Sequence, residues 1–236
     1  MKIITVKNLE KLNQLAAEII AEQVKGEPRS VLGFATGSSP VGTYKKLIDL
    51  NKSGVLDFSD VTSFNLDEYC GVPCTDSQSY HYFMMDKLFS HININKKNIN
   101  IPNGTAKNFA KECDQYEKKI MKAGGIDLQI LGVGNNGHIG FNEPDTVFYN
   151  KTRQVALTTN TINANKRFFA CVDDVPKTAL SMGTGTIMAA RKILLVAGPE
   201  KREIINQLKQ DTVSPQLPVS ILHYHPDCTI IFAEGE

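Results

Sequence analysis

The residues best suited to chemistry lie in the segment from Gly132 to Pro144, which reads GVGNNGHIGFNEP. Histidine titrates near neutral pH and can both take and give a proton, and a nearby carboxylate can orient its ring. His138 and Glu143 are therefore a candidate acid/base pair on a glycine-rich loop. The alternative for His138 is a structural role, with both ring nitrogens satisfied by hydrogen bonds.

Three glycines of this segment, Gly132, Gly134 and Gly137, also fit the GxGxxG pattern of dinucleotide-binding proteins. That pattern should open a long helix, yet the stretch from His138 to Pro144 contains two more helix-breaking residues and shows no helical period. An acidic residue about 20 positions later, where a ribose would need one, is also missing. A nicotinamide-dependent dehydrogenase therefore stays only as an alternative.

A second candidate is Thr36-Gly37-Ser38-Ser39-Pro40, which follows an apolar run from Val31 to Ala35. The glycine allows a tight turn, and the hydroxyls add hydrogen-bond donors. Ser39 suits an N-cap and Pro40 a first helical position, so free N–H groups of the next helix would face the loop. Such a loop favours an anion, phosphate above all, although a plain capped helix start would look the same.

Two adjacent acids, Asp67 and Glu68, follow the apolar run from Val61 to Asn65. A carboxylate at the end of a buried strand could act as a general base. A solvated turn is the alternative, and without other evidence the pair is a weak signal.

The sequence does not predict a metal site. Cys70, Cys74 and His81 lack a fourth ligand and are loosely spaced. We interpret His223 and His225 as structural or surface residues.

The elements that would position these residues alternate between strands and helices. The predicted strands are Ile3–Val6, Val31–Ala35, Val61–Asn65, Asp127–Gly132, Ile193–Ala197, Val219–Leu222 and Thr229–Ala233. The predicted helices are Leu9–Ile20, Pro40–Leu50, Ser77–Phe89, Ala106–Lys122, Thr184–Arg191 and Glu200–Gln210. This alternation predicts an α/β fold with an open, mostly parallel, Rossmann-like sheet sandwiched by helices, which binds ligands at the carboxyl ends of its strands. We expect one domain over residues 1–236, with a less regular excursion near the site.

Composition narrows the class of protein. The 236 residues carry 26 Lys and Arg against 25 Asp and Glu, so neither a nucleic-acid partner nor an acidic tail is indicated. No apolar run reaches the roughly 20 residues needed to span a bilayer, and the N-terminus lacks signal-peptide features. Five scattered cysteines argue against a disulfide scaffold. We expect a cytoplasmic protein without a membrane partner.

Taken together, these loops resemble a known family. The matching segments, in chain order, are ATGSSP (Ala35–Pro40), NLDEYCG (Asn65–Gly71), SYHYFM (Ser79–Met84), GVGNNGHIGFNEP (Gly132–Pro144), NANKRFF (Asn163–Phe169), DVPKTALSMGTGTIMAA (Asp174–Ala190) and GPEK (Gly198–Lys201). They resemble the glucosamine-6-phosphate deaminases, also called glucosamine-6-phosphate isomerases, from about residue 1 to residue 233 without large gaps. The pair LDEY and GHIGFNEP is the most specific part of the resemblance.

The resemblance implies a hydrolase of amino-sugar catabolism that needs no cofactor and takes part in the degradation of N-acetylglucosamine. It would convert D-glucosamine 6-phosphate and water to D-fructose 6-phosphate and ammonia. By position, Asp67 would move the C2 proton during enolisation. His138 would open the sugar ring by passing a proton between O1 and O5, supported by Glu143 and Asn136.

The same resemblance implies a phosphate site on Gly37, Ser38 and Ser39, with Arg167 and Lys201 supplying positive charge. Residues 145–175 match the family's lid. An aldose must open before its C2 proton becomes acidic, so a histidine, a carboxylate and a phosphate anchor suit this reaction on chemical grounds as well.

Two positions depart from the pattern. Asn136 stands where the best-studied members have aspartate, so His138 would rely on Glu143 for charge. Arg153 matches a position that binds the activator N-acetylglucosamine 6-phosphate in the long, hexameric members, but Val155 stands where a lysine would be. The chain also ends soon after Ala233, and we therefore expect a monomer or small homo-oligomer rather than an activated hexamer.

Two further classes are the alternatives to a deaminase. A 6-phosphogluconolactonase resembles this fold, but lactone hydrolysis does not need a base at C2 such as Asp67. A sugar-phosphate sensor would need a DNA-binding segment and a basic face, for which the first predicted strand at Ile3 leaves no room.

Overall fold

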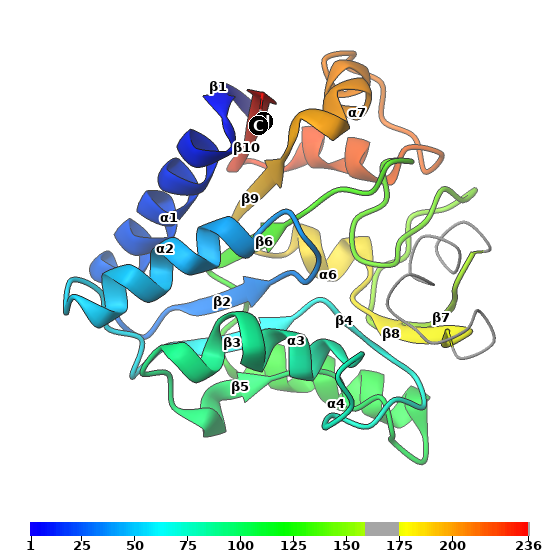
Figure 1. Ribbon diagram of the computed structural model, residues 1–236. Helices are drawn as coiled ribbons and strands as arrows, with labels where there is room; N and C mark the ends of the chain where they lie inside the picture. The colour runs from blue at the N-terminus through cyan, green and yellow to red at the C-terminus, as the bar shows by residue number, and fades with distance from the viewer. Residues whose placement is uncertain (159–174, 236) are drawn as a thin grey trace.

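The computed structural model describes residues 1–158 and 175–235. Within them the central sheet has seven strands in the order β1, β10, β9, β6, β2, β3, β5, and each neighbouring pair is parallel (Figure 1). The bounds are β1 Lys2–Asn8, β2 Val31–Phe34, β3 Thr62–Asn65, β5 Ile99–Asn100, β6 Leu128–Leu131, β9 Lys192–Ala197 and β10 Cys228–Gly235. The strand order changes direction between β2 and β6, and open α/β sheets bind ligands at such a point.

Helices cover both faces of this sheet (Figure 1). The α-helices are α1 Leu9–Gly26, α2 Val41–Lys52, α3 Tyr80–Lys87, α4 Phe109–Lys122, α6 Thr184–Met188 and α7 Arg202–Leu208. The 3₁₀ segments are η1 Phe89–His91, η2 Lys96–Asn98, η5 Pro199–Lys201 and η6 Pro218–Tyr224. One core packs α1, α2 and α3 against the sheet, and a second core packs α4, α6, α7 and η6 against its other face.

The strands supply both cores because successive side chains point to opposite faces. In β9, Leu194 and Val196 belong to the first core, while Ile193 and Leu195 belong to the second. This double burial explains why the central strands are continuous apolar runs in the sequence. The predicted open, parallel α/β sandwich is confirmed.

A second, smaller sheet lies at the carboxyl end of the first. It is antiparallel and has the order β4 (Asp67–Tyr69), β8 (Thr178–Ser181), β7 (Arg153–Ala156). Only Leu66 separates β3 from β4, so the chain passes directly from the central sheet into the small one. This passage places Asp67 above the edge of the central sheet.

Two local predictions were wrong. Val219–Leu222 lies in the 3₁₀ segment η6 rather than in a strand, because Pro218 starts a helical turn and the buried residues Val219 and Leu222 recur at a spacing of three. Helix α2 begins at Val41, with Pro40 as its cap residue, and Ser39 makes no capping hydrogen bond.

The strands β4, β5, β7 and β8 were not predicted. The single-domain assignment over residues 1–236 stays a prediction, and the central part of the predicted lid, residues 159–174, lies outside the described residues.

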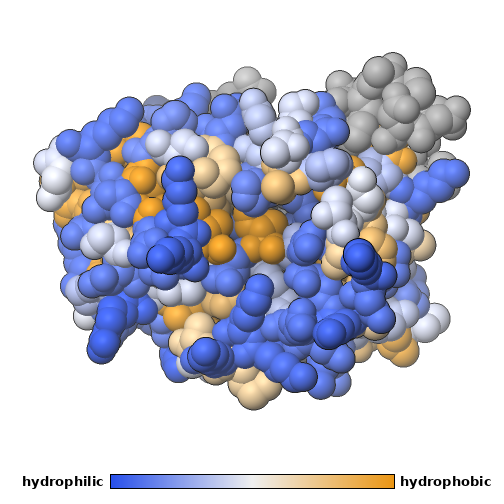
Figure 2. Space-filling model, turned by 90° about the horizontal axis from the view of Figure 1, so that it is seen from below, coloured by the Kyte–Doolittle hydropathy of each residue, from blue (hydrophilic) through white to orange (hydrophobic). Residues whose placement is uncertain are grey.

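The surface seen from below in the view of Figure 1 is mostly hydrophilic, with apolar side chains gathered near its middle (Figure 2). Among the described residues, no helix combines the length and the apolar character needed to cross a membrane.

Candidate active site

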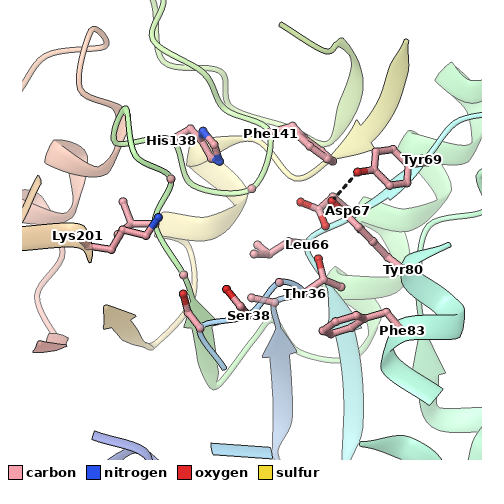
Figure 3. Close-up of a pocket in the computed structure, with 17 residues that line it drawn as sticks. Thr36, Ser38, Leu66, Asp67, Tyr69, Tyr80, Phe83, His138, Phe141 and Lys201 are labelled. Carbon is pink, nitrogen blue, oxygen red and sulfur yellow. Dashed lines mark hydrogen bonds between the residues drawn. The ribbon is translucent and has the colours of Figure 1, made fainter. Parts of the chain in front are cut away.

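A pocket of about 290 Å³ opens where the carboxyl ends of β2, β3 and β6 meet (Figure 3). This volume lies near the lower end of the range for small-molecule sites, about 300–1,000 Å³. The pocket is lined by Ala35, Thr36, Gly37, Ser38, Ser39, Leu66, Asp67, Tyr69, Tyr80, Phe83, Gly132, Val133, Gly134, His138, Gly140, Phe141 and Lys201. All three loops selected from the sequence therefore contribute to one cavity.

The loop after β2 forms one wall. Gly37 has a φ of 93°, a conformation that strongly favours glycine, so the chain turns sharply there. The cap residue of α2 is Pro40, and no side chain makes a capping hydrogen bond at this helix start. The Tyr44 hydroxyl of α2 donates to the Ala35 carbonyl at 2.6 Å and fixes the helix against the strand end. Backbone N–H groups at such a helix start attract anions.

Lys201, from η5 after β9, lines the pocket together with this loop. Its ammonium donates a hydrogen bond to the side-chain oxygen of Asn135. Partial burial is the main cause of a lowered Lys201 pKa. The arrangement places a cation beside the Gly37–Ser39 loop, which suits a dianionic phosphate.

Asp67, the first residue of β4, is only 6% exposed and lines the same pocket. Burial, followed by the charge of Glu68, raises the pKa of Asp67 from 3.8 to about 8. A carboxylate with so high a pKa is a strong base once ionised. Perturbed carboxyls of this kind in a pocket are typical of catalytic sites.

His138 lines the pocket on the loop after β6 and is held by Asn136 and Glu143. The Asn136 amide donates to Glu143 Oε2 at 2.6 Å, and the amide oxygen faces His138 Nδ1 at 2.7 Å. A carboxylate only accepts hydrogen bonds, so Glu143 sets the orientation of the amide. The amide oxygen in turn requires the proton on Nδ1 and leaves Nε2 as the basic nitrogen. Glu143 Oε2 also lies 3.5 Å from His138 Nδ1.

Two glycines of the GxGxxG pattern, Gly134 and Gly137, allow the His138 side chain to take its position. A Cβ on Gly134 would lie 2.2 Å from the His138 ring, so the ring occupies the space of the missing side chain. Gly137 has a φ of 82° and makes the turn before the histidine.

The same loop is braced by the small sheet. The Asn142 amide donates to the carbonyls of Ile139 and Met182, and its oxygen accepts a hydrogen bond from Arg153 Nη1 at 2.8 Å. The Phe141 N–H donates to the Ser181 hydroxyl at 3.0 Å. The loop that carries His138 and Glu143 is thereby tied to β7 and β8.

An aromatic wall beside Asp67 was not predicted from the sequence. Tyr69, Tyr80 and Phe141 line the pocket, and the Tyr80 ring stacks on Phe141 with ring centroids 6.0 Å apart. The two tyrosine hydroxyls are 3.2 Å apart, joined by a hydrogen bond (Figure 3). Both tyrosines stand in motifs that carry the family resemblance, LDEY and SYHYFM, and this was the only signal for them.

The predicted site residues fall into three groups. Those that line the pocket are Gly37, Ser38, Ser39, Asp67, His138 and Lys201. Asn136 and Glu143 contact His138 from outside the lining, and Arg167 lies outside the described residues. Within the described residues, no three metal-binding side chains come together.

The family model for glucosamine-6-phosphate isomerases/6-phosphogluconolactonase matches residues 6–231 of the chain. A glucosamine-6-phosphate deaminase of Thermoanaerobacter pseudethanolicus is 53% identical over 98% of this chain and 92% of its own length. A deaminase of the same name from Alkaliphilus oremlandii is 52% identical over 95% of this chain and 94% of its own length.

Solved structures give a consistent result. A monomeric glucosamine-6-phosphate deaminase, described as a missing link of the NagB superfamily, superposes with a TM-score of 0.96 at 43% identity, covering 99% of this chain and 97% of its own. A 6-phosphogluconolactonase from Thermotoga maritima reaches a TM-score of 0.78 at 19% identity, covering 100% and 99%, and shows the fold alone. The chain belongs to the glucosamine-6-phosphate isomerase/6-phosphogluconolactonase family.

Proposed function

We propose that the chain is an enzyme that converts D-glucosamine 6-phosphate and water to D-fructose 6-phosphate and ammonia. The observation that carries the proposal is the pairing, in one pocket, of a buried carboxyl at Asp67 with an oriented histidine at His138 beside an anion-binding loop. Relatives about 50% identical over nearly the whole chain are named for this activity.

The phosphate group is the proposed anchor of the substrate. The turn at Gly37, the hydroxyls of Ser38 and Ser39, and the Lys201 ammonium border one side of the pocket. Arg167 is proposed as a second cation for the same group. Fixing one end of the sugar phosphate lets binding energy orient the reacting carbons against the acid and the base.

Ring opening is assigned to His138. Its Nε2 is free to accept a proton because Asn136 holds the other proton on Nδ1. The imidazole takes the proton from O1 and gives it to O5, the C1–O5 bond breaks, and an open-chain aldehyde results. Glu143, connected through Asn136, stabilises the transient positive charge on the ring.

Proton transfer at C2 is assigned to Asp67. The open aldehyde makes the C2 proton acidic. The carboxylate removes it while O1 takes a proton from the substrate's C2 ammonium group, which gives an enolamine. Return of the proton to C1 gives the imine of the ketose, to which water adds at C2 as ammonia leaves. Positioned bases of this kind contribute about 10²–10⁴-fold to the rate.

The direct test supplies purified protein with glucosamine 6-phosphate and measures ammonia and fructose 6-phosphate, without added metal or nucleotide. Wild type should form both products, and Asp67→Asn should lower kcat by about 10²-fold or more because the base is lost. Tyr82→Phe, an exposed position on α3, is the matched control and should retain wild-type turnover.

Absence of both products in wild type would contradict the proposal. Hydrolysis of 6-phosphogluconolactone in their place would favour the lactonase alternative, which does not need Asp67 at C2.

We place the activity in amino-sugar degradation in the cytoplasm, carried out by a monomer or small homo-oligomer. The monomeric deaminase among the structural neighbours supports this state.

A further inference from the structure

Glu68 is a buried carboxyl that the proposed mechanism does not use. It follows Asp67 in β4 and is only 2% exposed. Burying a carboxyl costs free energy unless its oxygens are hydrogen-bonded, so the contacts of Glu68 indicate its role.

Three backbone N–H groups donate to this carboxylate. Oε1 accepts from Tyr69 at 2.8 Å and from Tyr80 at 2.9 Å, and Oε2 accepts from His81 at 2.8 Å. Tyr80 and His81 are the first two residues of α3, where helical N–H groups lack partners within the helix. The third, on Tyr82, donates to the Ser79 hydroxyl, so Glu68 and Ser79 together satisfy the helix start.

A neighbouring loop closes over this contact. Gly104 passes so near that an added Cβ would lie 2.0 Å from the Tyr69 carbonyl oxygen and 3.2 Å from Glu68 Cγ. The Gly71 N–H donates to the Gly104 carbonyl at 2.7 Å. With no space on that side, the Glu68 side chain is confined to the position in which it binds α3.

The contact joins the two elements that present the wall around Asp67. On β4, the neighbours of Glu68 are Asp67 and Tyr69, and on α3 its partner is Tyr80; all three of these line the pocket. Figure 3 shows the Tyr69 and Tyr80 side chains gathered beside Asp67. Besides Glu68, the 3.2 Å hydrogen bond between the Tyr80 and Tyr69 hydroxyls also joins α3 to β4.

We propose that Glu68 is a positioning residue, which clamps β4 to the first turn of α3 and so holds the Asp67 carboxyl in place for proton transfer at C2. The inference rests on the proposed function, because it takes Asp67 as the base.

The charge of Glu68 also acts on Asp67. Burial is the larger cause of the raised Asp67 pKa, and the charge of Glu68 is the second cause. The other titratable groups around Asp67 are the hydroxyls of Tyr69 and Tyr80, the Tyr116 hydroxyl from α4, and His138 and Lys201 across the pocket. Removing the Glu68 charge should therefore make Asp67 ionise at lower pH.

The test compares wild type, Glu68→Gln and Glu68→Asp for ammonia release over a range of pH. In Glu68→Gln one carboxylate oxygen is replaced by an NH₂ group, which cannot accept a hydrogen bond from a backbone N–H group. At least one of the bonds between β4 and α3 is then lost, and the clamp loosens. We expect kcat to fall by about 10²-fold, the effect of a displacement near 1 Å, with little change in KM because the phosphate loop is untouched. The acid limb of the kcat/KM profile should move to lower pH. Glu68→Asp keeps the charge but reaches fewer donors, so its kcat should fall while its profile stays in place.

Glu117→Gln is the matched control. Its Oε1 also accepts three hydrogen bonds, from the Thr152 N–H and the hydroxyls of Thr152 and Thr186, but Glu117 does not line the pocket. It should lose stability without a change in the pH profile. If wild type releases ammonia and Glu68→Gln has the same kcat and the same pH profile as wild type, the inference about Glu68 is overturned and the proposed function is not. If wild type releases no ammonia, both the proposed function and the inference that rests on it are overturned.

If Glu68→Gln does not fold, nuclear magnetic resonance on the wild-type protein decides the question. The amide protons of Tyr69, Tyr80 and His81 should shift together with the titration of the Glu68 carboxyl. Independent behaviour of these three amides would overturn the clamp.

Discussion

At the scale of single residues, the hydrogen bonds of Glu143 determine which nitrogen of His138 is basic. In Glu143→Gln the new amide can donate as well as accept, so Asn136 is free to turn over and present its NH₂ group to Nδ1. The ring proton would then move to Nε2, which could no longer accept the O1 proton. We predict that kcat falls by about 10²-fold or more, measured as ammonia release.

Exchange of the C2 proton with solvent should fall with the same variant, because C2 becomes acidic only after the ring opens. Substrate binding should persist, since Glu143 does not line the pocket. Turnover near the wild-type rate would show that the supporting role of Glu143 in ring opening is wrong.

The raised pKa of Asp67 leads to a prediction about stability. The folded chain holds a proton on Asp67 up to about pH 8, whereas the ordinary value is 3.8. The group therefore stabilises the fold fully below about pH 4, and this contribution is lost as pH rises toward 8, by about 1.4 kcal/mol per pH unit. Asn at this position does not titrate, so Asp67→Asn should gain stability relative to wild type across this window.

Urea unfolding of the two proteins at several pH values measures this difference. The free energy of unfolding of Asp67→Asn minus that of wild type should increase from about pH 4 to about pH 8 and then level off. A difference independent of pH would mean that Asp67 is not a buried, protonated group in the folded protein.

At the scale of elements, the sequence predicted what local patterns determine. The central strands are buried on both faces and are apolar runs, and α1 shows its buried residues Leu12, Ala16 and Ile20 at helical spacing. The small sheet could not be predicted in this way. Its strands have three or four residues, and β4 begins with two acids, so neither apolar content nor alternation marks them.

The candidate site likewise contains parts that local sequence patterns predict and parts that depend on tertiary packing. Its loops were predicted because glycines, hydroxyls and charged groups follow buried strands, and the carboxyl ends of parallel strands share one edge. The contact between Glu68 and Tyr80 joins residues 12 positions apart through a helix start that only the fold brings to the carboxylate. Which of two adjacent acids enters the pocket, and which binds the helix, depends on that packing.

At the scale of the whole molecule, Arg153 bears on regulation. Its guanidinium lies 3.8 Å from the centroid of the Tyr149 ring and donates a hydrogen bond to the Asn142 side-chain oxygen. Val155, two residues on, is 9% exposed and adds no charge. An activator phosphate bound here would have to displace the hydrogen bond from Arg153 to Asn142, which braces the loop that carries His138 and Glu143.

We therefore predict hyperbolic kinetics with glucosamine 6-phosphate, unchanged by N-acetylglucosamine 6-phosphate and independent of protein concentration. Steady-state rates with and without the acetylated sugar, combined with light scattering on the eluting protein, measure both properties. Because Arg153 supports the loop of Glu143 in this arrangement, Arg153→Met should lower kcat rather than abolish a response to an activator. Sigmoidal rates that become hyperbolic when the acetylated sugar is added, or a hexamer in solution, would show that subunits communicate through contacts beyond those of the single chain.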